Sequence, residues 1–215
     1  MDKIEAKVAD FFSAYKVRDY AKGQVLLLNG DEARNLFYLE KGKVKVYDVS
    51  YRGDEVILNV FKPKAFFPVS HILTTDSNRY IYEAETDLQL RQAPAADVLK
   101  FLETNPDVVL DLLRRVYVGV DGIMGRIAYL MSGSAKSRLI YELIIEARRF
   151  GKMNPDGSCA LTINEKDLGA RAGLSRETVS REVHKLKQEK LVRIENKDIF
   201  VTDMKALEQK LSQEL

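Results

Sequence analysis

The sequence predicts an α+β chain with three parts: an N-terminal β-roll, a long dimerisation helix and a C-terminal winged helix-turn-helix. Three observations carry this prediction. Glycines separate short β-like segments in the first half, apolar residues then repeat every 3.5 positions, and two capped helices flank a glycine near the C-terminus. We expect the boundaries to fall at residues 1–104, 105–132 and 133–215.

The composition of the 215 residues is that of a globular protein, because 46% of them are hydrophobic and the net charge is only +2. No run of about 18 uncharged apolar residues is present, so we expect no membrane span. The N-terminal residues Met1–Glu5 carry charges where a secretory signal needs an apolar stretch. We therefore expect a cytoplasmic protein.

Cysteine and histidine are too sparse for a metal or redox centre. Cys159 is the single cysteine, and it cannot form an internal disulfide or hold an iron–sulfur cluster. His71 and His184 lie far apart without paired ligand spacing. We expect no metal and no cofactor, and we find no catalytic triad or phosphate-binding glycine loop that indicates an enzyme.

Residues 20–96 have the pattern of short strands joined by glycine turns. Segments Gln24–Leu28, Lys43–Tyr47 and Glu55–Phe61 are rich in β-forming residues, and in the second of them charged and apolar residues alternate. This pattern predicts a sandwich or roll, preceded by a short amphipathic helix over residues 4–18.

A long helix follows Asn105, because Pro106 suits a first helical turn. Its apolar residues are spaced 4, 3, 4, 3, 4 and 3 apart, which is typical of a coiled-coil seam. The alternative is a helix buried along one stripe in its own domain, and the regular spacing favours a second copy of the chain. The seam comprises Val109, Leu113, Val116, Val120, Ile123, Ile127 and Leu130.

Three glycines at 119, 122 and 125 lower the helix propensity of this segment, and they allow close approach of another helix or a ligand. Ser132-Gly133-Ser134 is a plausible hinge before a further helix, Ser134–Phe150, which Gly151 ends. Residues Met153–Ser158 then read as a loop.

The segment Leu161–Leu191 predicts two helices joined by a tight turn. Thr162 and Glu165 form a candidate capping box for the first helix, Gly173 suits its left-handed end, and Ser175 caps the second helix. Val179, Val183 and Leu186 form the face of the second helix that must be buried, so the charged residues lie opposite. Two short apolar runs around Asn196-Lys197-Asp198 predict a wing hairpin.

The charged face of the second helix has the chemistry needed to read DNA bases. Arg pairs with guanine O6 and N7, and Glu accepts a hydrogen bond from cytosine N4. The alternative is a solvated charged face, but the cap, the turn and the helix all agree with DNA binding. Residues 134–195 hold 13 basic and nine acidic residues, which is consistent with an acidic partner but decides nothing alone. The expected base-reading residues are Arg176, Glu177, Ser180 and Arg181, and the expected phosphate contacts are Ser175, Thr178 and Lys185.

The segment Leu174–Arg181, which reads LSRETVSR, resembles the recognition helix of the Crp/Fnr family of transcription regulators. The resemblance extends over nearly the whole chain, including Asn105-Pro106-Asp107 before the long helix. It implies a cyclic-nucleotide-binding-like roll that senses an effector, a dimer, and a palindromic site with half-sites similar to TGTGA. It also implies contact of the exposed loop Lys152–Ser158 with RNA polymerase.

The effector pocket departs from the family's cyclic-nucleotide pattern, in which a Gly-Glu pair precedes Arg-Ser or Arg-Thr by about ten residues. Alignment on Arg79 places Pro68 and Val69 at the Gly-Glu positions and Tyr80 at the hydroxyl position. Proline lacks the N–H that faces a phosphate. Ile123 and Met124 stand where the cyclic-AMP-binding branch presents hydroxyls to adenine. We expect a degenerate pocket whose effector is unidentified and is not cyclic AMP.

Three alternatives remain beside this interpretation. His71 lies in the ligand region as a candidate haem ligand, although a partly exposed histidine at the start of a loop is the favoured interpretation. Cys159 fits a small buried residue in the strand before the helix-turn-helix better than a redox sensor. A ligand-binding regulatory subunit without DNA binding is a second function class, against which the Arg176–Arg181 motif argues.

Overall fold

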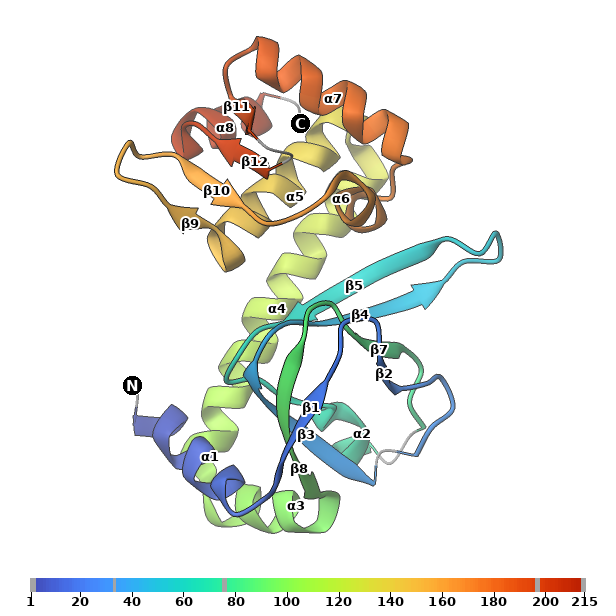
Figure 1. Cartoon of the computed structure of the whole chain (residues 1–215), viewed down its shortest axis with the longest axis vertical. Coiled ribbons are helices and arrows are strands. Elements are labelled where there is room, and N and C mark those ends of the chain that lie inside the picture. Colours follow the sequence, from blue (N-terminus) through green and yellow to red (C-terminus); the bar gives the residue numbers. More distant parts are fainter. Residues whose placement is uncertain (1–2, 33, 75–76, 196–197, 214–215) are drawn as a thin grey trace. The chain divides into compact units, whose positions relative to one another are not determined.

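The computed structural model describes residues 3–32, 34–74, 77–195 and 198–213. It divides into two compact units, Met1–Val118 and Gly119–Leu215 (Figure 1). No helix in the described ranges is long and apolar enough to cross a membrane.

The first unit begins with helix α1 (Lys3–Ser13) and continues into two four-stranded antiparallel sheets. One sheet has the order β1-β8-β3-β6, with bounds Val17–Tyr20, Leu88–Pro94, Asn35–Lys41 and Phe66–Phe67. The other has the order β2-β7-β4-β5, with bounds Val25–Leu27, Ile81–Ala84, Val44–Val49 and Glu55–Phe61. The predicted roll is therefore confirmed, and the three predicted strands correspond to β2, β4 and β5.

Aromatic side chains fill the space between the two sheets. The rings of Phe61 and Phe67 stack with centroids 4.7 Å apart, and Tyr82 stacks on Phe67 at 5.6 Å. Phe67 and Tyr82 belong to a buried cluster with aliphatic residues from both sheets. The interior of the roll next to Pro68 is thus a packed hydrophobic core.

Two helices of this unit were not predicted: α2 (Val69–Thr74) and α3 (Ala95–Thr104). The six residues of α2 are too few to show a helical period, and His71 lies within it, so its placement at the start of a loop was wrong. In α3 the residues Val98 and Leu102 supply a buried i, i+4 pair. The predicted helix over residues 4–18 ends earlier, because β1 pairs with β8 from Val17.

Helix α4 (Pro106–Ser132) starts at the predicted proline, and α5 (Ala135–Phe150) follows it after a tight corner. Ser134 caps α5 by accepting a hydrogen bond from the N–H of Ser137 at 3.1 Å. A Cβ at Gly133 would lie 2.5 Å from the carbonyl oxygen of Tyr129, so this corner has no room for a side chain.

The second unit continues with a four-stranded sheet and three helices (Figure 1). The strands, in the order β11-β12-β10-β9, are Val192–Glu195, Asp198–Val201, Cys159–Leu161 and Lys152–Met153. The helices are α6 (Glu165–Ala172), α7 (Arg176–Gln188) and α8 (Met204–Ser212). The two strands of the predicted wing pair with each other, while Asn196 and Lys197 lie outside the described residues.

Gly151 ends α5, as predicted. Its backbone angles are extended (φ −65°, ψ 145°). A Cβ there would lie 2.2 Å from the Sγ of Cys159, which is 2% exposed in β10. The prediction that Cys159 is a buried strand residue is confirmed, and close packing against it accounts for the glycine.

Candidate nucleic-acid interface

The turn between α6 and α7 depends on two glycines. Gly173 has φ +62° and ψ 40°, the predicted left-handed conformation. At Gly169 a Cβ would lie 2.6 Å from the carbonyl oxygen of Leu174, whose N–H donates to the Gly169 carbonyl oxygen at 3.0 Å. Helix α6 therefore lies too close to the backbone of the turn for a side chain at this position.

Each helix of the motif has an N-cap, and one cap differs from the prediction. Ser175 caps α7 as expected, accepting from the N–H of Thr178 at 3.2 Å. The capping box of Thr162 and Glu165 was wrong, because Asn164 caps α6 and accepts from the N–H of Asp167 at 2.8 Å. Asn is among the strongest N-cap residues. Asn164 stands three positions before Asp167, which is the same spacing as between Thr162 and Glu165, so the sequence offered both residues as caps.

The inner face of α7 is buried as predicted. Val179, Val183 and Leu186 are at most 1% exposed and belong to the core that α5, α6 and α8 share with the sheet. Glu182 is also buried and accepts from the Nζ of Lys185 at 2.7 Å. The sequence prediction missed Glu182, which the helical period places beside the apolar stripe.

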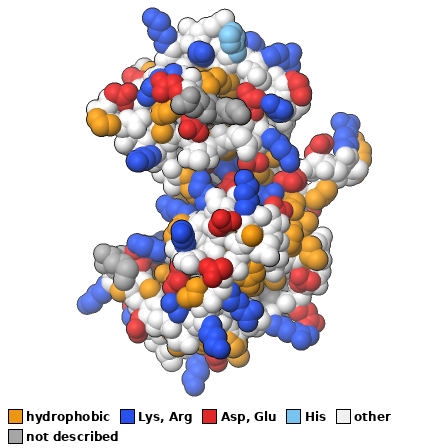
Figure 2. Space-filling model, in the orientation of Figure 1, with side chains coloured by type: hydrophobic (Ala, Val, Ile, Leu, Met, Phe, Trp, Pro, Cys, Tyr) orange, Lys and Arg blue, Asp and Glu red, His pale blue; other side chains and the backbone are white. Residues whose placement is uncertain are grey.

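The outer face of α7 presents the predicted base-reading residues to solvent: Arg176, Glu177, Ser180 and Arg181 are all exposed. Figure 2 shows Lys and Arg side chains on the surface of the part of the molecule that α7 occupies. Arg181 donates to the Oγ1 of Thr178 at 3.2 Å, and the Nε of Arg176 lies 3.5 Å from a carboxylate oxygen of Glu165.

Glu177 is held in its ionised form at the first turn of α7. A hydrogen bond from its own backbone N–H, and to a smaller extent one from the hydroxyl of Ser175, lowers the pKa of the Glu177 carboxyl below its ordinary value. The positive end of the helix dipole acts in the same direction. At neutral pH this carboxylate can therefore only accept hydrogen bonds, as base reading at cytosine N4 requires.

The three predicted phosphate contacts lie on or beside the same helix, and each already has an intramolecular partner. Ser175 and Thr178 are linked through their hydroxyl oxygens at 3.1 Å, and Lys185 pairs with Glu182. The side chain of Lys185 is still 58% exposed. The ammonium and one of the two hydroxyls can thus donate outward while these local contacts are kept.

Arg193, which the sequence prediction did not select, connects the wing to the loop Asn154–Ser158. Its guanidinium lies 4.3 Å from the ring centre of Phe200, 2.9 Å from the hydroxyl of Ser158 and 3.3 Å from the carboxylate of Asp156. Asp156 in turn accepts from the N–H of Ser158 at 3.0 Å. A wing arginine thus fixes the conformation of a loop about 37 positions earlier in the chain.

The predicted seam lies along α4 and is open to solvent in the single chain. The structure describes all of α4, and within it only Val108 is buried. The exposures are Val109 43%, Leu113 49%, Val116 56%, Val120 43%, Ile123 51%, Ile127 43% and Leu130 43%. An exposed apolar stripe of this length indicates an interaction surface.

The predicted effector residues differ in burial. Pro68 is buried, Val69 is half-buried at the start of α2, and Arg79 and Tyr80 are exposed. Ile123 and Met124 are exposed on α4, in the second unit. Among the described residues, no three His, Cys, Asp or Glu side chains gather in a way that could hold a metal ion.

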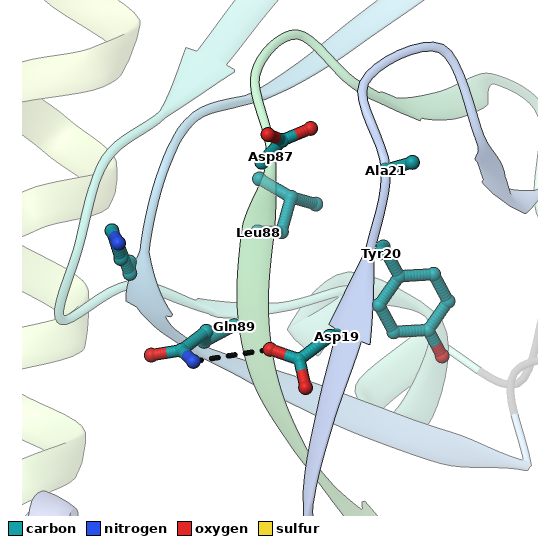
Figure 3. Close-up of a pocket in the computed structure, with 7 residues that line it drawn as sticks. Asp19, Tyr20, Ala21, Asp87, Leu88 and Gln89 are labelled. Carbon is teal, nitrogen blue, oxygen red and sulfur yellow. Dashed lines mark hydrogen bonds between the residues drawn. The ribbon is translucent and has the colours of Figure 1, made fainter.

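A surface pocket of about 370 Å³ lies at β1 and β8 of the roll, and none of the predicted effector residues lines it (Figure 3). Gln89 donates across it to Asp19 at 3.0 Å. Its lining comprises Asp19, Tyr20, Ala21, Lys41, Asp87, Leu88 and Gln89.

Comparison with known families gives two matches, one in each unit. Residues 17–105 match the cyclic nucleotide-binding domain, and residues 137–210 match the Crp-like helix-turn-helix domain. The matches cover the roll and the two-helix motif that the sequence predicts.

The relatives match over nearly the full length. The chain is 28% identical over 200 residues to a global nitrogen regulator of Synechococcus elongatus, covering 92% of this chain and 90% of the relative. It is 26% identical over 197 residues to the cAMP-activated global transcriptional regulator CRP of Salmonella typhimurium, covering 89% and 91%. The solved structure of a CRP/FNR-family transcriptional regulator from Thermus thermophilus has the same fold, with a TM-score of 0.75, 22% identity, and coverage of 93% and 100%.

Proposed function

This chain belongs to the Crp/Fnr family of DNA-binding transcription regulators, and from that premise we propose that it binds a two-fold symmetric DNA site as a homodimer and responds to an effector other than cyclic AMP. The observation that carries the proposal is the outer face of α7. It is capped, anchored by a buried inner face, and exposes two arginines and an ionised glutamate.

In this proposal α7 enters the major groove with its N-terminal end. Arg176 and Arg181 pair with guanines, Glu177 accepts from cytosine, and Ser180 contacts a further base edge. Ser175, Thr178 and Lys185 contact phosphates and fix the position of the helix without reading sequence. The half-sites are similar to TGTGA, in keeping with the resemblance of the recognition segment.

The dimer forms through the exposed stripe of α4, which lies within the dimerisation segment that we assign to residues 105–132. A second copy supplies a matching helix, so that the seven apolar residues of each chain pack into the other. The roll of residues 1–104 is the sensor in this scheme, and residues 133–215 form the reader. Binding of an effector shifts the population of dimers toward the geometry that fits DNA.

We propose that cyclic AMP is not the effector, although a relative carries cAMP in its name. Pro68 offers no N–H to a phosphate, Val69 offers no carboxylate to a ribose hydroxyl, and stacked aromatic rings occupy the roll next to them. Titration calorimetry with cyclic AMP is expected to give no heat of specific binding. A micromolar dissociation constant would contradict this part of the proposal.

RNA polymerase is the proposed protein partner, through the segment Lys152–Ser158. The segment was expected to be an exposed loop, but Lys152 and Met153 form strand β9, which pairs with β10, and Ser158 is only 3% exposed. The contacts of Arg193 with Asp156 and Ser158 support this role, because they hold the loop in one conformation and so lower the entropy cost of docking.

The test is selection of bound sequences from a random DNA pool with the purified full chain. We expect recovery of a two-fold symmetric site, with guanines at fixed positions in each half. The double variant Arg176→Ala/Arg181→Ala is the control and should enrich nothing. If the wild type enriches nothing, the selection is repeated with a small-molecule extract. Failure in both conditions contradicts sequence-specific DNA binding.

A further inference from the structure

Helix α5 carries two buried carboxylates on one side, one turn apart. Glu142 is 2% exposed and Glu146 is 1% exposed. A buried carboxylate is costly unless it is paired, so each must have a partner from another element. The two partners lie on different helices, α4 and α6, which places α5 between the proposed dimer helix and the helix-turn-helix.

Glu142 forms a bidentate ion pair with Arg126 of α4. The Nε of Arg126 donates to one carboxylate oxygen at 2.5 Å, and a terminal nitrogen donates to the other at 2.9 Å. The arginine side chain is 19% exposed. A bidentate contact between planar groups restricts direction as well as distance, so this pair fixes how α5 is oriented against the C-terminal part of α4.

Other contacts of Tyr141 in α5 also hold this helix against α4. Tyr141 donates from its hydroxyl to the carbonyl oxygen of Gly122 at 2.9 Å, and its ring lies 4.9 Å from that of Tyr129. A Cβ at Gly125 would lie 2.3 Å from the Tyr141 hydroxyl oxygen. One of the three glycines in α4 is therefore explained by the approach of α5. The half of α4 from Gly119 onward belongs to the same compact unit as the helix-turn-helix.

Glu146 connects α5 to the first helix of the helix-turn-helix. It pairs with Arg171 of α6, and both side chains are at most 6% exposed. Helix α6 leads to α7 through the glycine turn described above. Two buried carboxylates on successive turns of α5 thus link α4 to α6 through their ion pairs.

We propose that the Arg126–Glu142 pair is a positioning device that sets the spacing between the two half-sites the dimer reads. This inference rests on the proposed function. In a dimer built on α4, the angle between α4 and α5 in each chain decides where the two α7 helices lie. Hydrophobic residues of similar volume often replace a buried ion pair at equal or better stability, so we attribute directional specificity rather than stability to this pair.

The test measures affinity for DNA duplexes in which the two half-sites are set at the optimal separation or moved by one, two or three base pairs. A duplex with a single half-site is measured alongside. Joining two binding events raises affinity only when the geometry fits both, so the spacing profile reports how firmly the two readers are held. The variants are Glu142→Gln and the apolar double variant Arg126→Met/Glu142→Leu, which leaves no unpaired buried charge.

For both variants we expect the half-site affinity to stay within about twofold of wild type, while affinity at the optimal spacing falls about tenfold and the preference for that spacing broadens. The control is Glu208→Gln, which removes an exposed ion pair between Arg148 of α5 and α8 at 2.9 Å. It should leave the profile unchanged.

Other results overturn the inference in distinguishable ways. An unchanged spacing profile in both variants shows that the pair does not set the spacing. An equal loss at the half-site and at every spacing shows that it only supports folding of the unit. Wild-type protein that binds neither the half-site nor any symmetric duplex contradicts the proposed function, and this inference with it.

Discussion

Arg181 is exposed on α7, one turn beyond the capped first turn, with Thr178 as its intramolecular contact. The variant Arg181→Ala is expected to cost about 1–3 kcal/mol of binding free energy at the selected site and to relax the preference for guanine at one position in each half. Competition binding against duplexes altered at single positions measures both effects.

Lys187 provides the matched control for this arginine, since it is an exposed basic residue of the same helix near its C-terminal end. Lys187→Ala should leave the guanine preference intact. Equal weakening of Arg181→Ala on every sequence would make Arg181 a phosphate contact instead of a base reader.

Asn164 and Thr162 allow a test of the cap that the sequence prediction placed wrongly. Asn164→Ala removes the acceptor for the N–H of Asp167 and is expected to lower the free energy of unfolding by about 1 kcal/mol. Thr162→Ala changes an exposed side chain and should stay within about 0.5 kcal/mol of wild type. Urea unfolding followed by circular dichroism measures both, and a larger loss for Thr162→Ala would contradict the assignment.

At the scale of an element, the seam of α4 predicts an oligomer that one charge can disrupt. Val120 lies in the middle of the stripe, and Val120→Asp would bury an unpaired carboxylate in the dimer. The dimer dissociation constant should rise at least about 100-fold, since such a charge costs roughly 3 kcal/mol or more. Sedimentation equilibrium measures it. Ala128→Asp adds the same charge on α4 away from the seam, and equal dissociation of both variants would contradict the seam.

The sheet of β4, β5 and β7 predicts a loss of stability at high pH. Burial and the hydrogen bond to Glu83 raise the pKa of Tyr47 to about 12. Burial of Lys45 opposes its charge, but its hydrogen bonds to Glu55 and Glu83 leave the pKa of Lys45 above its ordinary value. Both groups are protonated in the fold, so their contribution is complete below the unfolded pKa values near 10 and is lost as pH rises through the folded ones.

The unfolding midpoint in urea should therefore fall between pH 10 and about 12, and Tyr47→Phe should reduce that fall. Tyr51→Phe is the control, because Tyr51 is 90% exposed on the same hairpin. A fall of the same size in Tyr47→Phe would show that this phenol does not contribute.

Long helices with a regular apolar repeat and helices with a strong cap were predictable from the sequence. Very short helices and ion pairs between distant residues were not. The start of α4 at Pro106, the turn at Gly173 and the cap at Ser175 follow from local chemistry. The six residues of α2 carry no period, and Glu142 gave no sign of burial. Its partner Arg126 lies 16 positions away on another helix, and only the packed structure brings the two together.

For the whole molecule, the sequence predicted the order of roll, long helix and helix-turn-helix, and the residues expected to read DNA are all exposed on one helix. The division into compact units at Val118 and Gly119, partway along α4, was not predictable, since the helical period runs through it without interruption. This division places the second half of α4 in the same compact unit as the helix-turn-helix, which is the basis for the proposed role of Arg126.

The most direct test of the account is a hydroxyl-radical footprint of the wild-type protein on its selected DNA site. A dimer that reads with α7 from each chain should protect two segments on one face of the duplex, with centres about 10 base pairs, or roughly 34 Å, apart. The protection should be lost in Val120→Asp at concentrations where that variant is monomeric. A single protected segment, or protection that is unchanged in the monomeric variant, would contradict the dimeric reader.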